Sequence, residues 1–142
     1  MRIDRFVLDC NIWISYLITG TEQQLIDLIA NNDVTVFSCN ELYEEIKRVL
    51  GYAHLAKYRV SVARALKLVK SITVHFELSY PIKRYIPTDK NDDYVVALAL
   101  QTSSGFITSG DKDILLEKEH LEKKFKKLVI LTKSEFERML KQ

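Results

Sequence analysis

Residues that break up or cross-link a chain are scarce in this sequence: its 142 residues include 4 Gly, 2 Pro and 2 Cys. The low glycine and proline contents exclude collagen-like and low-complexity classes, and a hydrophobic content of 47% excludes a disordered chain. Cys10 and Cys39 form neither a disulfide framework nor a zinc-ligand spacing. We therefore expect two buried thiols and a cytoplasmic protein, because free thiols persist in a reducing compartment.

Long apolar runs are also lacking. None approaches the ~20 residues that a membrane-spanning helix requires, and the apolar segment before Asp9 is only Phe6 to Leu8, too short for a signal peptide. We expect no membrane association. The length is typical of one domain, so residues 1–142 are predicted to form a single one.

Five short, continuously apolar runs rich in β-branched residues predict buried strands. They span residues 3–8, 34–37, 72–76, 106–108 and 128–131. Helical spacing of apolar residues occupies 11–30 (interrupted near 19–21), 40–50, 60–70, 92–102 and the C-terminal stretch, with Thr21 and Ser134 as expected caps. This alternation predicts a three-layer α/β/α fold, with a parallel sheet of about five strands and helices on both faces.

Acidic residues stand where this sheet would bind a ligand. Asp9 ends the first strand, Asp111 follows the fourth, and Asp92 and Asp93 open the helix before the fourth. Ligands of such sheets lie beyond the carboxyl ends of the strands, at a switch in strand order. Each Asp alone could equally be a helix cap. Gathered in one crevice, however, the carboxylates would repel one another unless a cation lay among them.

The helix over residues 40–50 offers one more acid, from Glu41, Glu44 or Glu45. At ~100° per residue, Glu45 lies about 90° from the centre of the apolar face, Glu41 about 130° and Glu44 about 170°. Glu45 therefore borders the buried face and is the predicted site residue. A set of carboxylate oxygens suits Mg²⁺ or Mn²⁺ rather than zinc.

Four segments that carry these acids resemble the motifs of the PIN-domain family of metal-dependent ribonucleases. They are residues 7–11, 41–50, 89–100 and 108–116, so the resemblance covers nearly the whole chain. The sequence is most similar to small prokaryotic PIN proteins that act as toxins of type II toxin–antitoxin pairs. The sequence departs from the usual motifs at three positions. Cys10 stands where the family commonly has Thr or Ser, Ser109 where it commonly has Thr, and Asp93 where it commonly has Asn.

The resemblance implies an endoribonuclease that hydrolyses RNA phosphodiester bonds with metal-activated water, using one or two Mg²⁺ or Mn²⁺ ions. The catalytic and metal-binding acids that it implies are Asp9, Glu45, Asp92 and Asp111. The supporting residues are Asn11, Asp93, Ser109 and Asp113, and whether Asp92 or Asp93 is the ligand stays open. The implied partners are single-stranded RNA, a cognate antitoxin protein and a second copy in a homodimer.

Other functions fit fewer residues. A stand-alone RNA-processing PIN nuclease would use the same acids without an antitoxin. A phosphatase that phosphorylates its own Asp would require a second Asp where Asn11 stands, and a receiver-like signalling module would require an Asp after the third strand, where only Glu77 occurs. The three histidines share no metal spacing, which disfavours a His-pair ribonuclease.

The formal net charge of +2 hides an uneven distribution. Residues 1–46 carry 2 basic and 8 acidic groups, residues 47–90 carry 10 basic and 2 acidic groups, and residues 91–142 carry 9 of each. The basic segment also contains Tyr52, Tyr58, Tyr80 and Tyr85. It could follow a phosphate backbone and stack on unpaired bases, or form a solvated face with its tyrosines packed inward. The candidate RNA-binding residues are Lys47, Arg48, Lys57, Arg59, Arg84 and Lys90.

Overall fold

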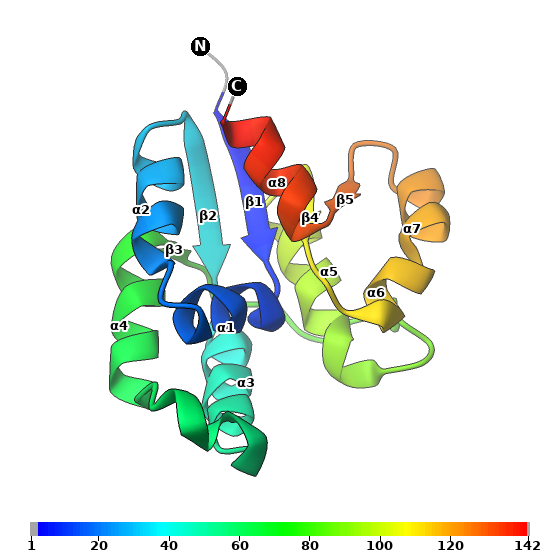
Figure 1. Ribbon diagram of the computed structural model, residues 1–142. Helices are drawn as coiled ribbons and strands as arrows, with labels where there is room; N and C mark the ends of the chain where they lie inside the picture. Colours follow the sequence, from blue (N-terminus) through cyan, green and yellow to red (C-terminus); the bar gives the residue numbers. More distant parts are fainter. Residues whose placement is uncertain (1–2, 142) are drawn as a thin grey trace.

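The computed structural model describes residues 3–141, which build a five-stranded sheet in the order β3-β2-β1-β4-β5 (Figure 1). The strands are β1 (Asp4–Leu8), β2 (Val34–Ser38), β3 (Val74–His75), β4 (Phe106–Thr108) and β5 (Val129–Leu131). All neighbouring strands run parallel. The chain adds β2 and β3 on one side of β1 and then returns to add β4 and β5 on the other. The strand order therefore switches at β1, and the carboxyl end of β1 is the expected ligand position.

Helices cover both faces of this sheet, as predicted. In Figure 1, α2 (Glu22–Ala30) and α8 (Lys133–Leu140) lie in front of the sheet, and α5 (Asp93–Gln101) lies behind it. The other helices are α1 (Cys10–Ile18), α3 (Asn40–Leu50), α4 (Val62–Ile72), α6 (Lys112–Leu116) and α7 (Lys118–Lys124), with 3₁₀ helices η1 (Ala53–Tyr58) and η2 (Lys90–Asp92). The three-layer α/β/α arrangement is confirmed.

The core is built on the continuous apolar character of β1. The ring of Phe6 stacks on that of Phe106 in β4 at 4.7 Å and meets Phe136 of α8 edge-on at 5.4 Å. The indole nitrogen of Trp13 in α1 donates to the carbonyl oxygen of Leu8 at 3.1 Å. Burial of apolar surface and this hydrogen bond thus fix the end of β1, where Asp9 follows, against α1.

Helix α5 is buried, and so are the two acids at its start, Asp92 and Asp93. Residues from Asp93 to Ala99 are all buried, as its nearly uniform apolar sequence predicts. Cys10 and Cys39 are both free and buried, which confirms the expected burial of the two thiols. Among residues 3–141, no helix combines the length and apolarity needed to cross a bilayer.

Two local predictions were wrong, and a third, the cap at Thr21, holds for its position only. Helix α4 runs through Ile72, so the strand predicted over residues 72–76 shrinks to two exposed residues, Val74 and His75. Packing of buried Leu68 and Val69 holds α4 and overrides local β-propensity. The cap of α8 is Thr132 rather than Ser134, because Thr132 and Glu135 form a reciprocal capping box. Thr21 stands at the start of α2 but its side chain makes no capping hydrogen bond.

Candidate metal centre

A hydrogen bond between Asp9 and Ser109 links the carboxyl ends of the neighbouring strands β1 and β4. Asp9 begins α1, where its Oδ1 accepts a hydrogen bond from the Cys10 amide at 2.7 Å. Its Oδ2 accepts from the Ser109 hydroxyl, also at 2.7 Å, and its side chain is buried. Asn11 adds a second link, because its Oδ1 accepts from the Gly110 amide at 3.2 Å. Asp9 is therefore both a helix cap and a carboxylate at the strand-order switch.

Asp111 is tied to the same serine. Its amide donates to the Ser109 hydroxyl oxygen at 3.0 Å, and its Oδ1 caps α6 by accepting from the Asp113 amide at 2.8 Å. The second carboxylate oxygen of Asp111 has no capping role. The Ser109 side chain thus holds Asp9 and Asp111 in one hydrogen-bonded chain at the ends of β1 and β4.

Glu45 enters from α3 with the orientation that its helical phase predicts. Its side chain is 14% exposed, whereas that of Glu44 is 71% exposed. The Tyr94 hydroxyl donates to Glu45 Oε1, and Arg48 Nη2 lies 3.6 Å from Glu45 Oε2. Tyr94 is a buried residue of α5, so Glu45 is fixed between α3 and α5. Sequence reasoning missed Tyr94, since only the tertiary packing pairs these helices.

Asp92 and Asp93 are adjacent but have different surroundings. Asp93 Oδ1 accepts from the amides of Tyr85 and Ile86 at 2.9 and 2.8 Å, and its Oδ2 pairs with Arg84 Nε at 2.8 Å. Asp92 is 3% exposed, and its Oδ2 has no hydrogen-bond partner. A buried carboxylate oxygen without a donor is costly. Both oxygens of Asp93 are therefore occupied by contacts with the preceding loop, whereas one oxygen of Asp92 has no protein partner.

Burial raises the pKa of these acids. The pKa of Asp9 rises to about 7 and that of Asp92 to about 8, and in both residues burial is the main cause. The charges of Asp111 and Asp9 raise the pKa of Asp92 further. Burial also raises the pKa of Glu45, against the lowering effect of its hydrogen bond from Tyr94. Such crowding of carboxylates favours either protonation or a bound cation.

A further acid belongs to this region. In residues 3–141, one set of three carboxylates has ligand oxygens that all lie within 4.8 Å of one another: Asp89, Asp92 and Asp113. Asp89 is the N-cap of η2 and stands three residues before Asp92. Residues so spaced eclipse one another in a 3₁₀ turn. Sequence reasoning placed Asp89 in a motif but not in the site, because the α-helical start expected at Asp92 concealed this turn.

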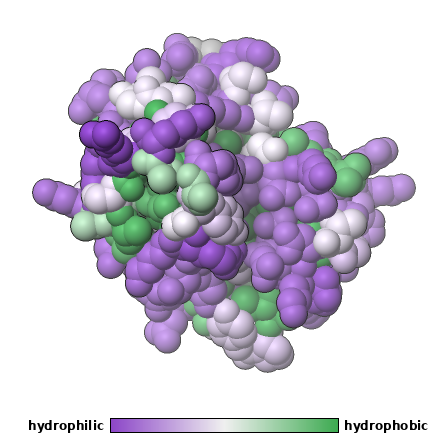
Figure 2. All heavy atoms as spheres, turned by 60° about the horizontal axis from the view of Figure 1, so that its bottom comes forward, coloured by the Kyte–Doolittle hydropathy of each residue, from purple (hydrophilic) through white to green (hydrophobic). Residues whose placement is uncertain are grey.

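A groove of about 490 Å³ opens beside Glu45, between α3 and the loop that leads to η2. It is lined by acids, bases and two tyrosines, including Glu41, Glu44, Glu45, Arg48, Tyr80, Lys90 and Tyr94. Figure 2 brings this end of the molecule forward and shows a largely hydrophilic surface interrupted by groups of apolar residues. The groove gives solvent and solutes a route towards Glu45.

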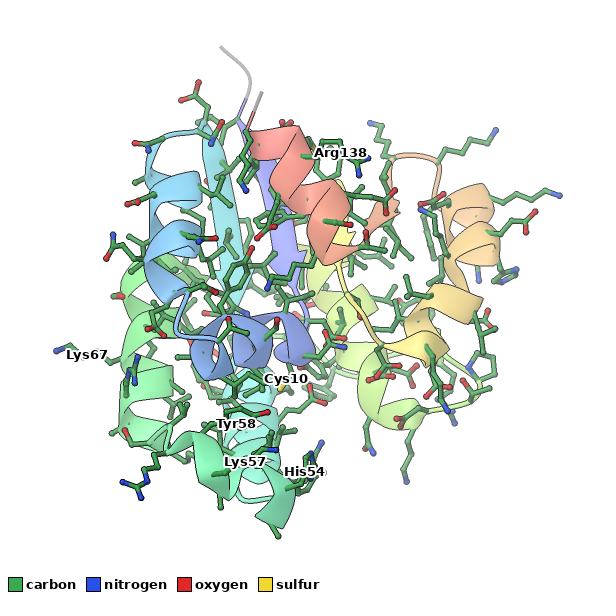
Figure 3. The ribbon with its side chains drawn as sticks, in the orientation of Figure 1. Cys10, His54, Lys57, Tyr58, Lys67 and Arg138 are labelled. Carbon is green, nitrogen blue, oxygen red and sulfur yellow. The ribbon has the colours of Figure 1, made fainter. Side chains whose placement is uncertain are left out.

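The six candidate RNA-binding residues lie in different environments. Arg48 and Arg84 pair with Glu45 and Asp93, and Lys47 pairs with Glu44 at 3.2 Å. Lys90 lines the groove. Lys57 and Arg59 lie at η1 and are exposed, as Figure 3 shows for Lys57.

The tyrosines of the basic segment do not all pack inward. Tyr52, Tyr58 and Tyr80 are 44%, 41% and 64% exposed. Tyr85 is half-buried, with its ring 6.0 Å from that of Phe125. The alternative of a solvated face with inward tyrosines therefore holds for Tyr85 only.

The residues present fit a hard divalent cation. The acids offer oxygen ligands only, and the buried Asp92 oxygen lacks a protein donor. Mg²⁺ and Mn²⁺ prefer such ligands, whereas zinc sites usually include His or Cys. The three histidines are exposed, and none belongs to the carboxylate set.

The fold and site together define an α/β/α protein with carboxylates gathered at the carboxyl edge of its sheet. The sequence model of the PIN domain matches residues 5–113, and the chain belongs to the PIN-domain family. PIN domains are generally nucleases that use divalent metals.

A chain in the crystal structure of VapBC2 from Rickettsia felis, bound to a DNA fragment from their promoter, has a similar fold. The TM-score is 0.53 at 14% sequence identity, over 90% of this chain and 98% of that chain. Comparison with curated protein sequences gave no match.

Proposed function

We propose that the protein is an endoribonuclease that depends on Mg²⁺ or Mn²⁺ and hydrolyses RNA phosphodiester bonds. The observation that carries the proposal is the buried, unpartnered Oδ2 of Asp92, which lies among carboxylates whose charges raise the pKa of Asp92. Membership of the PIN-domain family supports the same reaction class. One or two ions would be held by Asp9, Glu45, Asp92 and Asp111.

The bound ion would activate a water molecule and neutralise charge that develops on the phosphate. The residues around it keep the ligands in place. Ser109 and the Cys10 amide orient Asp9, and Tyr94 and Arg48 orient Glu45. Asn11 holds the loop after β4 against the start of α1 through the Gly110 amide. Ligands fixed in this way need little rearrangement when the ion and the substrate bind.

The substrate proposed is single-stranded RNA. Exposed Tyr52 and Tyr58 offer aromatic faces beside the basic residues of η1. Unpaired bases stack on such faces, while Lys and Arg contact phosphates. Lys57 and Arg59 are accordingly the strongest candidates for RNA contact, and Lys47, Arg48, Arg84 and Lys90 are further ones.

We also propose that the protein is the toxin of a toxin–antitoxin pair, that it forms a homodimer, and that it acts in the cytoplasm. The fold shared with a chain of the VapBC2 structure supports an antitoxin partner. Co-expression with the product of a neighbouring gene, followed by affinity purification and light scattering, tests the pairing and the dimer. A monomer that purifies alone and spares host growth would instead favour the stand-alone RNA-processing nuclease.

The nuclease activity is tested with the double variant Asp9→Asn, Asp111→Asn on a labelled single-stranded RNA in Mn²⁺. Both substitutions keep an oxygen that accepts the capping hydrogen bond, so the fold should persist. We expect cleavage to fall at least 10²-fold, as expected when a catalytic metal is lost. Asp33→Asn, in an exposed residue next to the amino end of β1, is the control for the loss of a carboxylate charge away from the candidate acids and should cleave normally. Metal-dependent cleavage by the folded double variant would disprove the proposal.

A further inference from the structure

We infer that a pocket at the β3 edge of the sheet binds a backbone phosphate of the RNA through Lys70 and His75. The pocket has a volume of about 330 Å³ and lies between the start of α3, the end of α4 and β3; it is lined by Asn40, Tyr43, Lys70, Thr73 and His75. The inference deepens the proposed function and rests on RNA as the substrate. Neither Lys70 nor His75 belongs to the candidate RNA-binding residues or to the acids of the metal centre.

The charge of this pocket is the first observation. None of the residues that line it is acidic. Lys70 lies in the last turn of α4, with its Nζ 4.9 Å from the centre of the Tyr43 ring. Within residues 3–141, Lys70 forms no ion pair with a carboxylate, whereas Lys47, Arg48 and Arg84 all do. The ammonium group of Lys70 is therefore available to an anion.

A chain of hydroxyl groups determines where His75 carries its proton. Each hydroxyl has one proton to donate. The Thr73 hydroxyl donates to the Val69 carbonyl oxygen at 2.7 Å, so it accepts from Ser38, also at 2.7 Å. Ser38 then accepts from the Tyr43 hydroxyl at 2.7 Å. The Tyr43 oxygen must therefore accept from His75 Nδ1, which lies 3.1 Å away.

This arrangement leaves the other ring nitrogen of His75 for a ligand. The ring stacks on Tyr43 at 5.7 Å, and Nδ1 donates to Tyr43 whether the imidazole is neutral or protonated. The ring therefore keeps its orientation in both forms. In the protonated form Nε2 is a donor as well, and a phosphate oxygen is a strong acceptor for it. Because Lys70 and His75 both contact Tyr43, their donors belong to one pocket.

Asn40 connects this pocket to the groove at Glu45, because it lines both. Asn40 and Glu45 belong to the same helix, α3, and are separated by about 7.5 Å along its axis at 1.5 Å per residue. About two nucleotides cover this distance, at ~3.4 Å per nucleotide of a stacked strand. Tyr80 lines the groove and is 64% exposed, so its ring can stack on a base. A strand at Glu45 can thus place a base in the groove and a neighbouring phosphate in the pocket.

The test measures the affinity for a labelled single-stranded RNA by fluorescence anisotropy in EDTA, where neither metal binding nor cleavage contributes. The variants are Lys70→Ala and His75→Ala. Lys67→Ala, on the exposed side of the same helix, is the control for the loss of one charge. All three residues are exposed, so the fold should persist. We expect Lys70→Ala to weaken binding about tenfold with a shallower salt dependence, and His75→Ala to weaken it about threefold. An affinity equal to that of the control in either variant would overturn the inference.

Inorganic phosphate tests the ligand chemistry of the pocket directly. In nuclear magnetic resonance spectra, the nitrogen signals of His75 should place its proton on Nδ1 before phosphate is added. Added phosphate should shift the ring signals of His75 in the wild type and not in Lys70→Ala. The absence of a shift in the wild type would overturn the inference. A shift combined with unchanged RNA affinity in Lys70→Ala would indicate a site for free phosphate and overturn the assignment to RNA.

RNA cleavage by the wild type is assayed separately in Mn²⁺. RNA binding that depends on Lys70 without any cleavage would disprove the nuclease proposal alone. Cleavage by the wild type, with RNA affinity unchanged in Lys70→Ala, would disprove the phosphate pocket alone.

Discussion

The hydroxyl of Ser109 donates a 2.7 Å hydrogen bond to Oδ2 of Asp9, across 100 residues of sequence. The same oxygen of Ser109 accepts from the Asp111 amide at 3.0 Å. One buried side chain therefore couples the ends of β1 and β4, and with them two of the proposed metal ligands.

Ser109→Ala should impair both folding and cleavage. It removes the donor to a buried carboxylate, which costs about 1–3 kcal/mol of unfolding free energy. Because Asp9 then loses its orientation, we expect cleavage to fall about 10-fold. Urea denaturation and single-turnover cleavage measure the two effects. Ser104→Ala, which removes another buried hydroxyl, hydrogen-bonded to Thr102, should affect stability alone. Equal cleavage by both variants would contradict the role given to Ser109.

Tyr94→Phe should reduce cleavage with little loss of stability. The ring keeps its packing in α5, but Glu45 loses the hydroxyl that fixes Oε1. We expect an approximately 10-fold fall in kcat and a lower affinity for Mn²⁺. Tyr16→Phe is the matched control, since the Tyr16 hydroxyl donates to Glu137 of α8 at 2.5 Å, away from the carboxylate set. If Tyr16→Phe lowers cleavage as much, the effect of Tyr94 is not specific to the site.

Asp92 and Asp93 should separate function from stability. Asp93→Ala removes an acceptor of two amides and the partner of Arg84, so we expect a loss of about 2–4 kcal/mol of unfolding free energy. Asp92→Asn should leave the fold intact and abolish cleavage, because Asp92 has an oxygen that the protein does not use. Chemical denaturation and cleavage by each variant provide the comparison. An active Asp92→Asn variant would refute the assignment of Asp92 as a ligand.

Short-range patterns in the sequence predicted where several of the candidate acids lie in the fold. The apolar runs of β1 and β4 placed Asp9 and Asp111 at strand ends, and the phase of α3 selected Glu45 over Glu44. Patterns of this range could not choose between Asp92 and Asp93, because the choice depends on the amides of Tyr85 and Ile86 in an irregular loop. Tyr94 was missed for a similar reason, since its partner lies on another helix.

The two-residue strand β3 could not be predicted accurately from the sequence. Its residues are exposed at the edge of the sheet, so no buried apolar run identifies it, and Ile72 belongs to the preceding helix. The five-strand count was still obtained, because the other four strands follow their apolar runs closely. Burial, rather than β-propensity alone, made those strands predictable.

Stability of the metal-free protein should fall between pH 5 and pH 8. Burial raises the pKa of Asp9 to about 7 and of Asp92 to about 8, so the folded protein binds more protons than the unfolded chain in this range. The neutral forms of these two carboxyl groups contribute fully to the free energy of unfolding at a pH below their pKa in the unfolded chain. That contribution is lost as the pH rises through their pKa values in the folded protein. Thermal melts in EDTA should show a falling Tm, and Mg²⁺ should restore more at pH 8 than at pH 5.

The variant Asp92→Asn provides the control for this pH dependence. It cannot ionise, so its metal-free Tm should fall less between pH 5 and pH 8 than that of the wild type. Its stabilisation by Mg²⁺ should also be smaller. Parallel pH profiles for the two proteins would show that Asp92 does not carry the effect.

RNA binding should depend on η1, which lies within the basic segment of residues 47–90. Lys57 Nζ lies 5.2 Å from the centre of the Tyr58 ring, and both side chains are exposed (Figure 3). Removing both in Lys57→Ala, Tyr58→Ala takes away one phosphate contact and one stacking face, so we expect about 10-fold weaker binding and a shallower salt dependence. Fluorescence anisotropy with single-stranded RNA, in the Asp9→Asn, Asp111→Asn background, measures both. Lys67→Ala, on the exposed side of α4, is the control for the loss of one charge (Figure 3). Binding equal to that of the control would place the RNA path elsewhere on the protein.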